Sequence, residues 1–225
     1  MQLKQKGFTL VEIAIVLVII GLLLGGILKG QELISNARVR NVADQVNAVK
    51  AAYFAFQDRY RALPGDYLQA QAIANIPNVV RGGNGNGQID PGAEQVEAWR
   101  HLANAGFISC AQCTAGAGTT PGNDNSPTNA YGGVMSIVYD GAYNNQAAGA
   151  GPLQNNLKTG NQIPSNILVE VDRKIDDGNP RTGSLRFSTF FATGAAPVPA
   201  TCAPIGSDNW LVVPPDNNCG AAALF

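Results

Sequence analysis

Glu12 is the only charged residue in the apolar run 8–28, and a carboxylate in such a run has to be stabilised by some partner. The run has 21 residues, which is long enough for a helix to cross a bilayer core of roughly 30 Å. A carboxylate inside such a segment costs on the order of 2.5 kcal/mol unless a partner meets it. The sequence therefore predicts a partner for Glu12. The alternative is a side chain that reaches back to the membrane surface, since Glu12 lies only one turn inside the run.

The residues before the run favour a retained membrane segment with a cytoplasmic N-terminus. Lys4 and Lys6 precede the run without any acid, and basic residues flanking a span stay on the cytoplasmic side. A secretory signal peptide would need a cleavage site of small residues directly after the apolar segment. Leu28 is instead followed by Lys29, Gly30 and Gln31. A plain signal anchor remains an alternative.

The segment Gly-Phe-Thr-Leu-Val-Glu at 7–12, behind its short basic leader, resembles the processing site of type IV pilins and type II secretion pseudopilins. In that family a prepilin peptidase in the membrane cuts after the glycine, and the new N-terminal residue is methylated. The resemblance implies cleavage between Gly7 and Phe8 and N-methylation of Phe8. Glu12 then becomes the fifth residue of the mature chain. The resemblance covers about the first thirty residues.

The same resemblance implies a structural role in a polymer, with Glu12 as an assembly residue. Cleavage frees the amine of Phe8, which can meet the Glu12 carboxylate of a neighbouring subunit. Because an unpaired buried carboxylate is heavily penalised, this pairing favours one axial register. The implied partners are prepilin peptidase, other pilin subunits in a homo- or hetero-polymer, an inner-membrane assembly platform and, before assembly, membrane lipid.

The apolar run is expected to be the first half of a longer helix, from residue 8 to about residue 60. Such a helix would be roughly 80 Å long, and Pro64 and Gly65 give a stop signal. Apolar residues recur every three or four positions, which is compatible with a coiled coil or with docking on a sheet of the same chain. This stripe consists of Val39, Val42, Val46, Val49, Tyr53, Phe56, Tyr60 and Leu63.

The rest of the chain is expected to form one loop-rich domain of about 160 residues. A second helix is predicted at 95–106, and strands at 134–139, 167–171, 185–191 and 210–213. Residues 123–129 and 142–151 are predicted as mobile loops. The fold class is α+β, a pilin fold with a long helix packed on a small antiparallel sheet. The expected divisions are a leader at 1–7, a transmembrane and assembly helix at 8–28, its amphipathic continuation at 29–63 and a periplasmic or extracellular domain at 64–225.

Four cysteines lie in the part of the chain that this topology places outside the cytoplasm, where disulfides persist. Three connectivities are possible, and Cys110–Cys113 with Cys202–Cys219 is favoured. The second pair resembles the disulfide-bounded C-terminal region of many pilins. A zinc site is a weaker alternative because Cys202 and Cys219 are far apart, and a redox Cys-x-x-Cys because the short pair follows a helix end.

Two acidic, glycine-bearing segments are candidate calcium sites. The first resembles part of an EF-hand loop, with Asn84, Asn86, Asp90 and Glu94 as the expected ligands. It departs from that pattern because glycine at 82 and alanine at 93 replace the expected leading and bidentate acids. An ordinary Asn-Gly turn is the alternative.

The second segment offers Asp172, Asp176 and Asp177 after a predicted strand. It resembles a stretch of proteobacterial pilin-like proteins. Its Asp-Asp-Gly sequence equally suits an ordinary hairpin turn.

Nothing in the sequence favours an enzyme. His101 is the one histidine and is expected to be structural, and the net charge of −1 gives no basic field for nucleic acid. The leading hypothesis is a minor type IV pilin, held in the inner membrane by a single pass and then built into a surface pilus. A pseudopilin of a type II secretion system, ending in a periplasmic pseudopilus, is the first alternative. A membrane-anchored periplasmic binding domain is the second.

Overall fold

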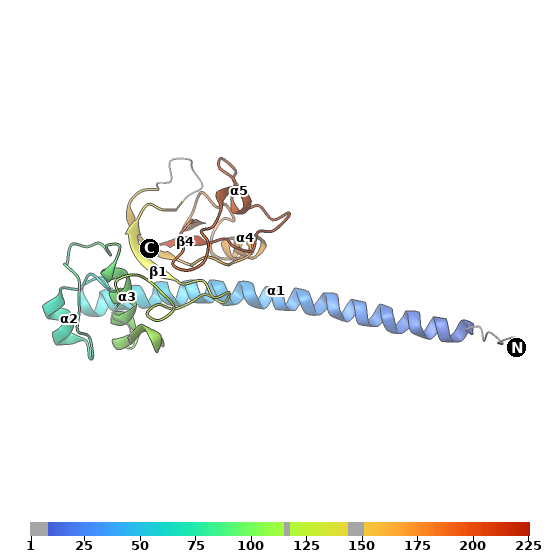
Figure 1. The fold of residues 1–225 in the computed structure, drawn as a ribbon, viewed down its shortest axis with the longest axis horizontal. Coiled ribbons are helices and arrows are strands. Elements are labelled where there is room, and N and C mark those ends of the chain that lie inside the picture. Colours follow the sequence, from blue (N-terminus) through green and yellow to red (C-terminus); the bar gives the residue numbers. More distant parts are fainter. Residues whose placement is uncertain (1–8, 115–117, 144–150) are drawn as a thin grey trace, which may run out of the picture. The chain divides into compact units, whose positions relative to one another are not determined.

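A computed structural model describes residues 9–114, 118–143 and 151–225, and it confirms the α+β class (Figure 1). The chain divides into two compact units, Met1–Arg38 and Val39–Phe225. The helices are α1 (Leu10–Tyr60), α2 (Gln69–Asn75), α3 (Ala93–Asn104), α4 (Ser165–Ile175) and α5 (Pro199–Cys202), with a 3-10 turn η1 (Gln112–Thr114). The strands are β1 (Ser136–Asp140), β2 (Gln154–Lys158), β3 (Leu185–Phe187) and β4 (Ala221–Leu224).

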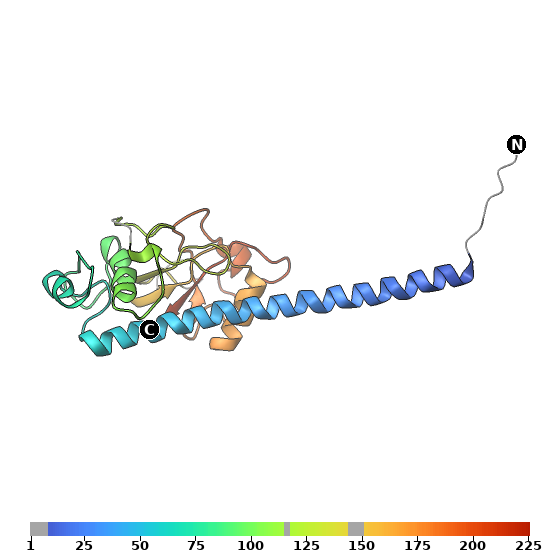
Figure 2. The same cartoon turned by 90° about the horizontal axis from the view of Figure 1, so that it is seen from below.

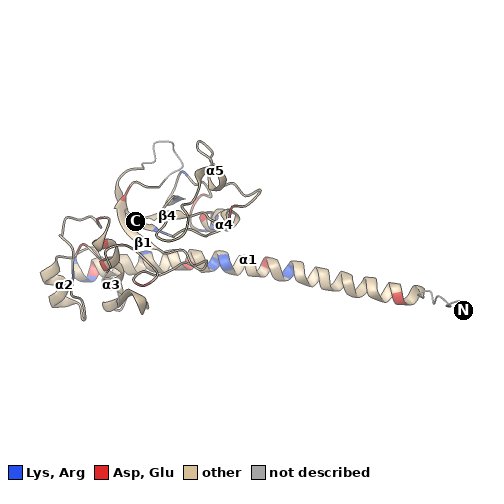
Figure 3. Ribbon diagram, in the orientation of Figure 1, with Lys and Arg blue, Asp and Glu red and all other residues tan. Residues whose placement is uncertain are grey.

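Within the first unit, residues 10–28 of α1 are apolar on all sides apart from Glu12. Their side chains are exposed, for example Leu22 at 74% and Leu28 at 67%. The helix contains a window of mean hydropathy 2.8 with none of its residues buried, so its length and composition would allow it to cross a membrane. Figure 3 shows few charged residues along this part of the helix. An apolar surface of this kind requires lipid or other subunits around it.

The part of α1 in the second unit is amphipathic, and the predicted stripe is its buried face. Val46 and Phe56 are completely buried, and one core cluster joins them to side chains of the sheet, α3 and α4. Figures 1 and 2 show this part of α1 running beside the rest of the second unit. The stripe therefore docks within the same chain. The helix ends at Tyr60, and Arg61 adopts a left-handed φ of 54° directly after it.

The four strands form one antiparallel sheet in the order β1-β2-β4-β3. A row of apolar residues crosses all four strands at matching register, namely Ile137, Leu157, Ala223 and Leu185. All four side chains are completely buried and belong to the core cluster that contains the α1 stripe. This row explains why the sheet holds its register, because a shift by one residue would turn the apolar side chains to the opposite face.

Several predicted elements are wrong in type or extent. Residues 167–171 lie in helix α4, because Ile167, Leu168 and Val171 bury one helical face after Pro164. Residues 210–213 form no strand beyond an isolated bridge from Val212 to Pro215, and the strand at 185–191 shortens to β3.

Two strands and two short helices were not predicted from the sequence. Strand β2 is rich in polar residues, β4 consists mostly of alanine, and α2 and α5 are only seven and four residues long. The segment 123–129 was expected to be mobile, but Asn129 Nδ2 donates to the carbonyls of Thr159 and Asn161, at 2.9 Å each. Of the other predicted mobile loop, residues 144–150 lie outside the described part of the chain.

His101 of α3 connects two turns of the second unit. Its Nδ1 accepts from the N–H of Gly65 at 3.0 Å, and its Nε2–H donates to the carbonyl of Arg81 at 3.0 Å. Gly65 has a φ of 88°, and a Cβ there would lie 2.4 Å from the carbonyl oxygen of Glu94. His101 is completely buried, and burial lowers its pKa to about 4. The ring is therefore neutral and structural.

This burial predicts a loss of stability in acid. The pKa of His101 is about 4 in the folded state and 6.5 in the unfolded chain, so the unfolded state binds more protons between these values. The free energy of unfolding should fall as the pH drops from 6.5 toward 4, by up to about 1.4 kcal/mol per pH unit. Urea unfolding of the full chain in detergent, with His101→Gln as the comparison, measures this slope. Equal slopes in the two proteins would contradict the assignment to His101.

Candidate functional site

The carboxylate of Glu12 lies at the first turn of α1 and is held by Thr9. The N–H of Thr9 donates to Glu12 Oε2 at 2.7 Å, and the Thr9 hydroxyl donates to the same oxygen at 2.8 Å. In return the N–H of Glu12 donates to Thr9 Oγ1 at 3.3 Å. This arrangement is a capping box, in which threonine and glutamate satisfy backbone N–H groups that the first turn leaves free. Thr9 is thus a partner of Glu12 within its own helix, and the pairing with the Phe8 amine of a neighbouring subunit stays a prediction.

Thr9 is a residue that the sequence analysis missed, although its signal was present. Threonine followed three residues later by glutamate, before an apolar run, is the capping-box pattern. Both donors meet Oε2, and Oε1 of Glu12 has no donor among residues 9–114, 118–143 and 151–225. Gly7 and Phe8, the predicted processing residues, lie outside the described residues.

A family model for the prokaryotic N-terminal methylation motif matches residues 2–28. The match supports, for residues 2–28, the resemblance to type IV pilins and pseudopilins. The match includes the Gly7–Phe8 bond, the capping box and the apolar part of α1, and it ends before the globular unit. Comparison with curated proteins and with solved structures gives no match. For this pilin-like chain the motif implies a structural subunit that prepilin peptidase processes and that is anchored in a membrane before assembly.

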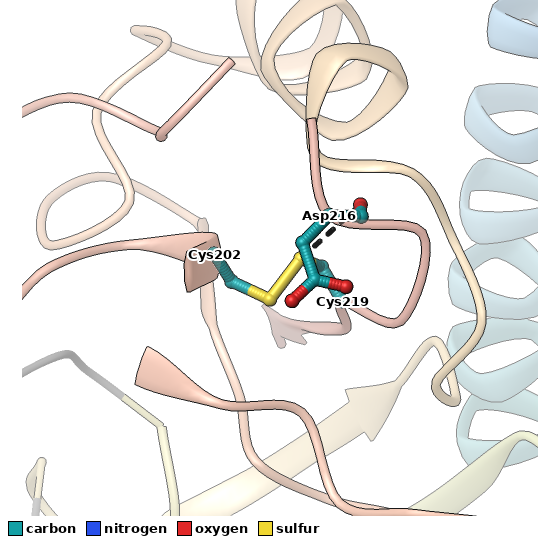
Figure 4. Close-up of side chains that lie close together, drawn as sticks. All are labelled: Cys202, Asp216 and Cys219. Carbon is teal, nitrogen blue, oxygen red and sulfur yellow. Dashed lines mark hydrogen bonds between the residues drawn. A yellow bond between two sulfur atoms is a disulfide. The ribbon is translucent and has the colours of Figure 1, made fainter. Parts of the chain in front are cut away.

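The four cysteines of the pilin-like chain form the two pairs that the sequence favoured. Cys110 bonds to Cys113 just after α3, and Cys202 of α5 bonds to Cys219 just before β4. Figure 4 shows the second pair beside Asp216, whose carbonyl oxygen lies 3.7 Å from Cys219 Sγ. Because both sulfurs are bonded to each other, this cluster supplies no thiolate to a metal. Its role is to tie α5 to the strand that enters the centre of the sheet.

The first candidate calcium segment is brought together as a closed turn. Asn84 and Asn86 both donate through Nδ2 to Asp90 Oδ2, at 3.0 Å each. Glu94 accepts from the N–H groups of Asn84 at 3.1 Å and Asp90 at 2.9 Å. All four predicted residues therefore meet, and protein donors satisfy both carboxylates. Burial is the largest influence on Glu94 and raises its pKa.

Asp66 lies at the centre of this turn and was also missed, since it comes from a different part of the sequence. It is 3% exposed, and its carboxylate accepts from the N–H groups of Gly85, Asn86 and Gly87 at 2.7, 3.0 and 2.8 Å. Three N–H groups that converge on one carboxylate stabilise its charge without a metal. The observed contacts make this turn structural, and calcium binding there stays a prediction.

The second candidate segment follows helix α4, not a strand as predicted. Asp172, Asp176 and Asp177 place carboxylate oxygens within 4.8 Å of one another. Asp172 is completely buried, and its Oδ2 accepts from Trp210 Nε1–H at 2.8 Å. Burial raises the pKa of Asp172 to about 6, and the neighbouring carboxylates also raise it, while the Trp210 hydrogen bond opposes this. Trp210 is a contact that no sequence signal indicated.

The two disulfides predict unequal losses of stability on removal. A disulfide constrains the unfolded chain more when it closes a longer loop, and the sequence separations are 17 and 3. Replacing both Cys202 and Cys219 by serine should lower the free energy of unfolding by about 3 kcal/mol, and the matched change at Cys110 and Cys113 by about 2 kcal/mol. Urea unfolding of the full chain without reductant measures both. A larger loss for the Cys110–Cys113 pair would contradict this order.

Proposed function

We propose that this chain is a structural subunit of a type IV pilus, and specifically a minor pilin. The observation that carries the proposal is the methylation motif at 2–28, which leads directly into a long helix with an exposed apolar surface. Removal of the leader between Gly7 and Phe8 converts an anchored precursor into a subunit with a free N-terminal amine. The helix then polymerises with the helices of other subunits.

The contacts of Glu12 suggest how the subunits align. Oε2 is occupied by the two donors of Thr9, and Oε1 has no donor in the described part of the chain. The Phe8 amine of a neighbouring subunit binds Oε1 and neutralises the carboxylate. Such a charge-assisted pair is strong in an apolar environment, and a displaced subunit would leave both charges buried without a partner. The pair therefore selects one axial position.

The precursor is proposed to cross the inner membrane once, with its N-terminus in the cytoplasm. Lys4 and Lys6 support this orientation, and the exposed side chains of the first unit would contact lipid. On assembly those side chains exchange lipid for the helices of other subunits, so the assembly platform has to extract the helix without exposing it to water.

The proposal predicts a defined mature mass. The protein purified from the membrane fraction should begin at Phe8 and carry one extra methyl group, and in cells without prepilin peptidase it should keep Met1. Intact-mass spectrometry measures both forms. A native protein that begins at Met1 would favour the anchored binding domain instead.

Neutralising Glu12 should separate processing from assembly. Glu12→Gln should be cleaved normally, because the change lies beyond the Gly7–Phe8 bond, while incorporation into fibres should fall by at least roughly tenfold. The measurement is the fraction of the chain in sheared fibres against the membrane fraction. Glu32→Gln is the matched control, because Glu32 lies exposed on the same helix and forms a surface ion pair with Lys29 at 2.7 Å. Equal losses in both variants would remove the special role of Glu12.

Immunogold imaging of the same cells distinguishes the pilus from a secretion pseudopilus. Label on long surface fibres is the expected result. Label confined to the periplasm would support the pseudopilin alternative while leaving the Glu12 mechanism intact.

A further inference from the structure

The turn that follows Gly83 contains both Asn-Gly sequences of the chain, Asn84-Gly85 and Asn86-Gly87. Asparagine before glycine is the sequence most open to deamidation, because glycine has no side chain to hinder ring closure. The glycine nitrogen attacks Cγ of the asparagine and forms a new C–N bond, and Nδ2 leaves as ammonia with the hydrogen of the glycine N–H. Water then opens the succinimide ring to aspartate or isoaspartate. Both asparagines are therefore chemically labile unless the fold opposes this reaction.

The two glycine nitrogens that would have to react both donate to the carboxylate of Asp66. The nitrogen of Gly85 lies 2.7 Å from Oδ1, and the nitrogen of Gly87 lies 2.8 Å from Oδ2. Asp66 is only 3% exposed, so little water reaches it to replace a lost donor. Ring closure consumes the glycine hydrogen, and it would leave a buried carboxylate oxygen without that donor. The nitrogen also reacts most readily when deprotonated, and the neighbouring carboxylate opposes a second negative charge.

The asparagine side chains are held by separate contacts. Oδ1 of Asn84 accepts from the N–H of Asn86 at 2.9 Å, and Oδ1 of Asn86 accepts from the N–H of Gln88 at 2.8 Å. Both Nδ2 groups donate to Asp90 Oδ2 at 3.0 Å. Loss of ammonia would remove a donor from Asp90, and the aspartate produced would set a carboxylate against it instead. The contacts therefore favour the amide form over the intermediate and over the product.

The turn also needs the labile sequence. Gly85 and Gly87 have φ values of 75° and 82°, a backbone conformation that favours glycine. The asparagine before each glycine accepts from the backbone two residues ahead, which is the contact that shapes such turns. The residues that build the turn are thus the residues that make it reactive.

We infer that Asp66 protects Asn84 and Asn86 from deamidation. Its two carboxylate oxygens bind the two attacking nitrogens, one each, and so oppose the first step of the reaction at both sites. This chemical role is additional to the structural role of Asp66 in closing the turn. It concerns the globular unit alone, so the proposed pilin function stands or falls separately.

Peptide mass spectrometry measures the protection directly. The full chain in detergent is incubated at mildly alkaline pH while folded, and the same chain is incubated in urea to give the unprotected rate. Digestion at low pH then yields the conversion of Asn84 and Asn86 to aspartate and isoaspartate over time. We expect both sites to react at least roughly tenfold more slowly in the folded chain. Equal rates in the two samples would overturn the inference.

Asp66→Asn assigns the protection to the carboxylate. The change keeps the shape of the side chain but removes its charge and one acceptor oxygen. Deamidation at Asn86 should rise at least roughly tenfold. The rise at Asn84 should be smaller, because the nitrogen of Gly85 also donates to the main-chain carbonyl of Asp66 at 3.0 Å, which the variant keeps. Asp44→Asn is the matched control, since Asp44 is exposed on α1, and it should react like the parent.

Two results in a folded Asp66→Asn protein would contradict the inference. An unchanged rate at Asn86 would mean that the rigidity of the turn suffices, and a slower rate would mean that Asp66 acts as a base and promotes the attack. Circular dichroism establishes beforehand that the variant is folded. If it is not, hydrogen exchange in the parent decides, because exchange also begins with deprotonation of the glycine N–H. Slow exchange at Gly87 is expected, and exchange as fast as in urea would refute the protection.

Discussion

Glu12 carries a charge at the start of a helix whose neighbouring side chains are apolar and exposed, and in lipid that charge needs a partner. Thr9 partly meets this need within the subunit, because its N–H and its hydroxyl both donate hydrogen bonds to one oxygen of the Glu12 carboxylate. A cap of two neutral donors lowers the penalty of the charge without removing the charge itself. Under the proposed function, the precursor can therefore remain in the membrane, and the Phe8 amine of another subunit still gains free energy by pairing with Glu12.

Helix α1 connects two different environments with one continuous backbone. Its side chains at 10–28 are exposed and, apart from Glu12, apolar, and in the second unit one face is buried against the sheet, α3 and α4. The buried row across β1, β2, β4 and β3 and the disulfide between Cys202 and Cys219 fix the surface on which that face packs. The second unit is thereby built around its own part of α1.

The sequence predicted the features that depend on local periodicity and on short motifs. The length of α1, its buried stripe, α3 and the methylation motif all follow from patterns within a few turns of helix. The prediction of a strand at 167–171 was wrong because β-branched residues are also compatible with a helix when their spacing buries one face, as in α4. The strands β2 and β4 were missed because their environment, rather than their own residues, makes them strands. Lys158 of β2, for example, is completely buried and is held by Asp140 at 2.8 Å.

The candidate sites show the same division between local and distant contacts. Thr9 could have been predicted from its spacing to Glu12, whereas Asp66 and Trp210 reach their partners only through the tertiary fold. The Asp66 carboxylate accepts from backbone N–H groups of the turn at 84–94, and Trp210 donates to the buried carboxylate of Asp172. Two segments of similar composition therefore have different contacts, which sequence alone did not distinguish.

The central claim is that the free amine of one subunit neutralises Glu12 of another. A cryo-EM reconstruction of fibres that contain this chain measures the distance between the Phe8 nitrogen and the nearest Glu12 carboxylate of a neighbouring subunit. The account predicts an ion pair of about 4 Å or less, with Thr9 still bonded to the same carboxylate. A Glu12 that contacts only its own Thr9, with the amine of every neighbouring subunit far away, would contradict it.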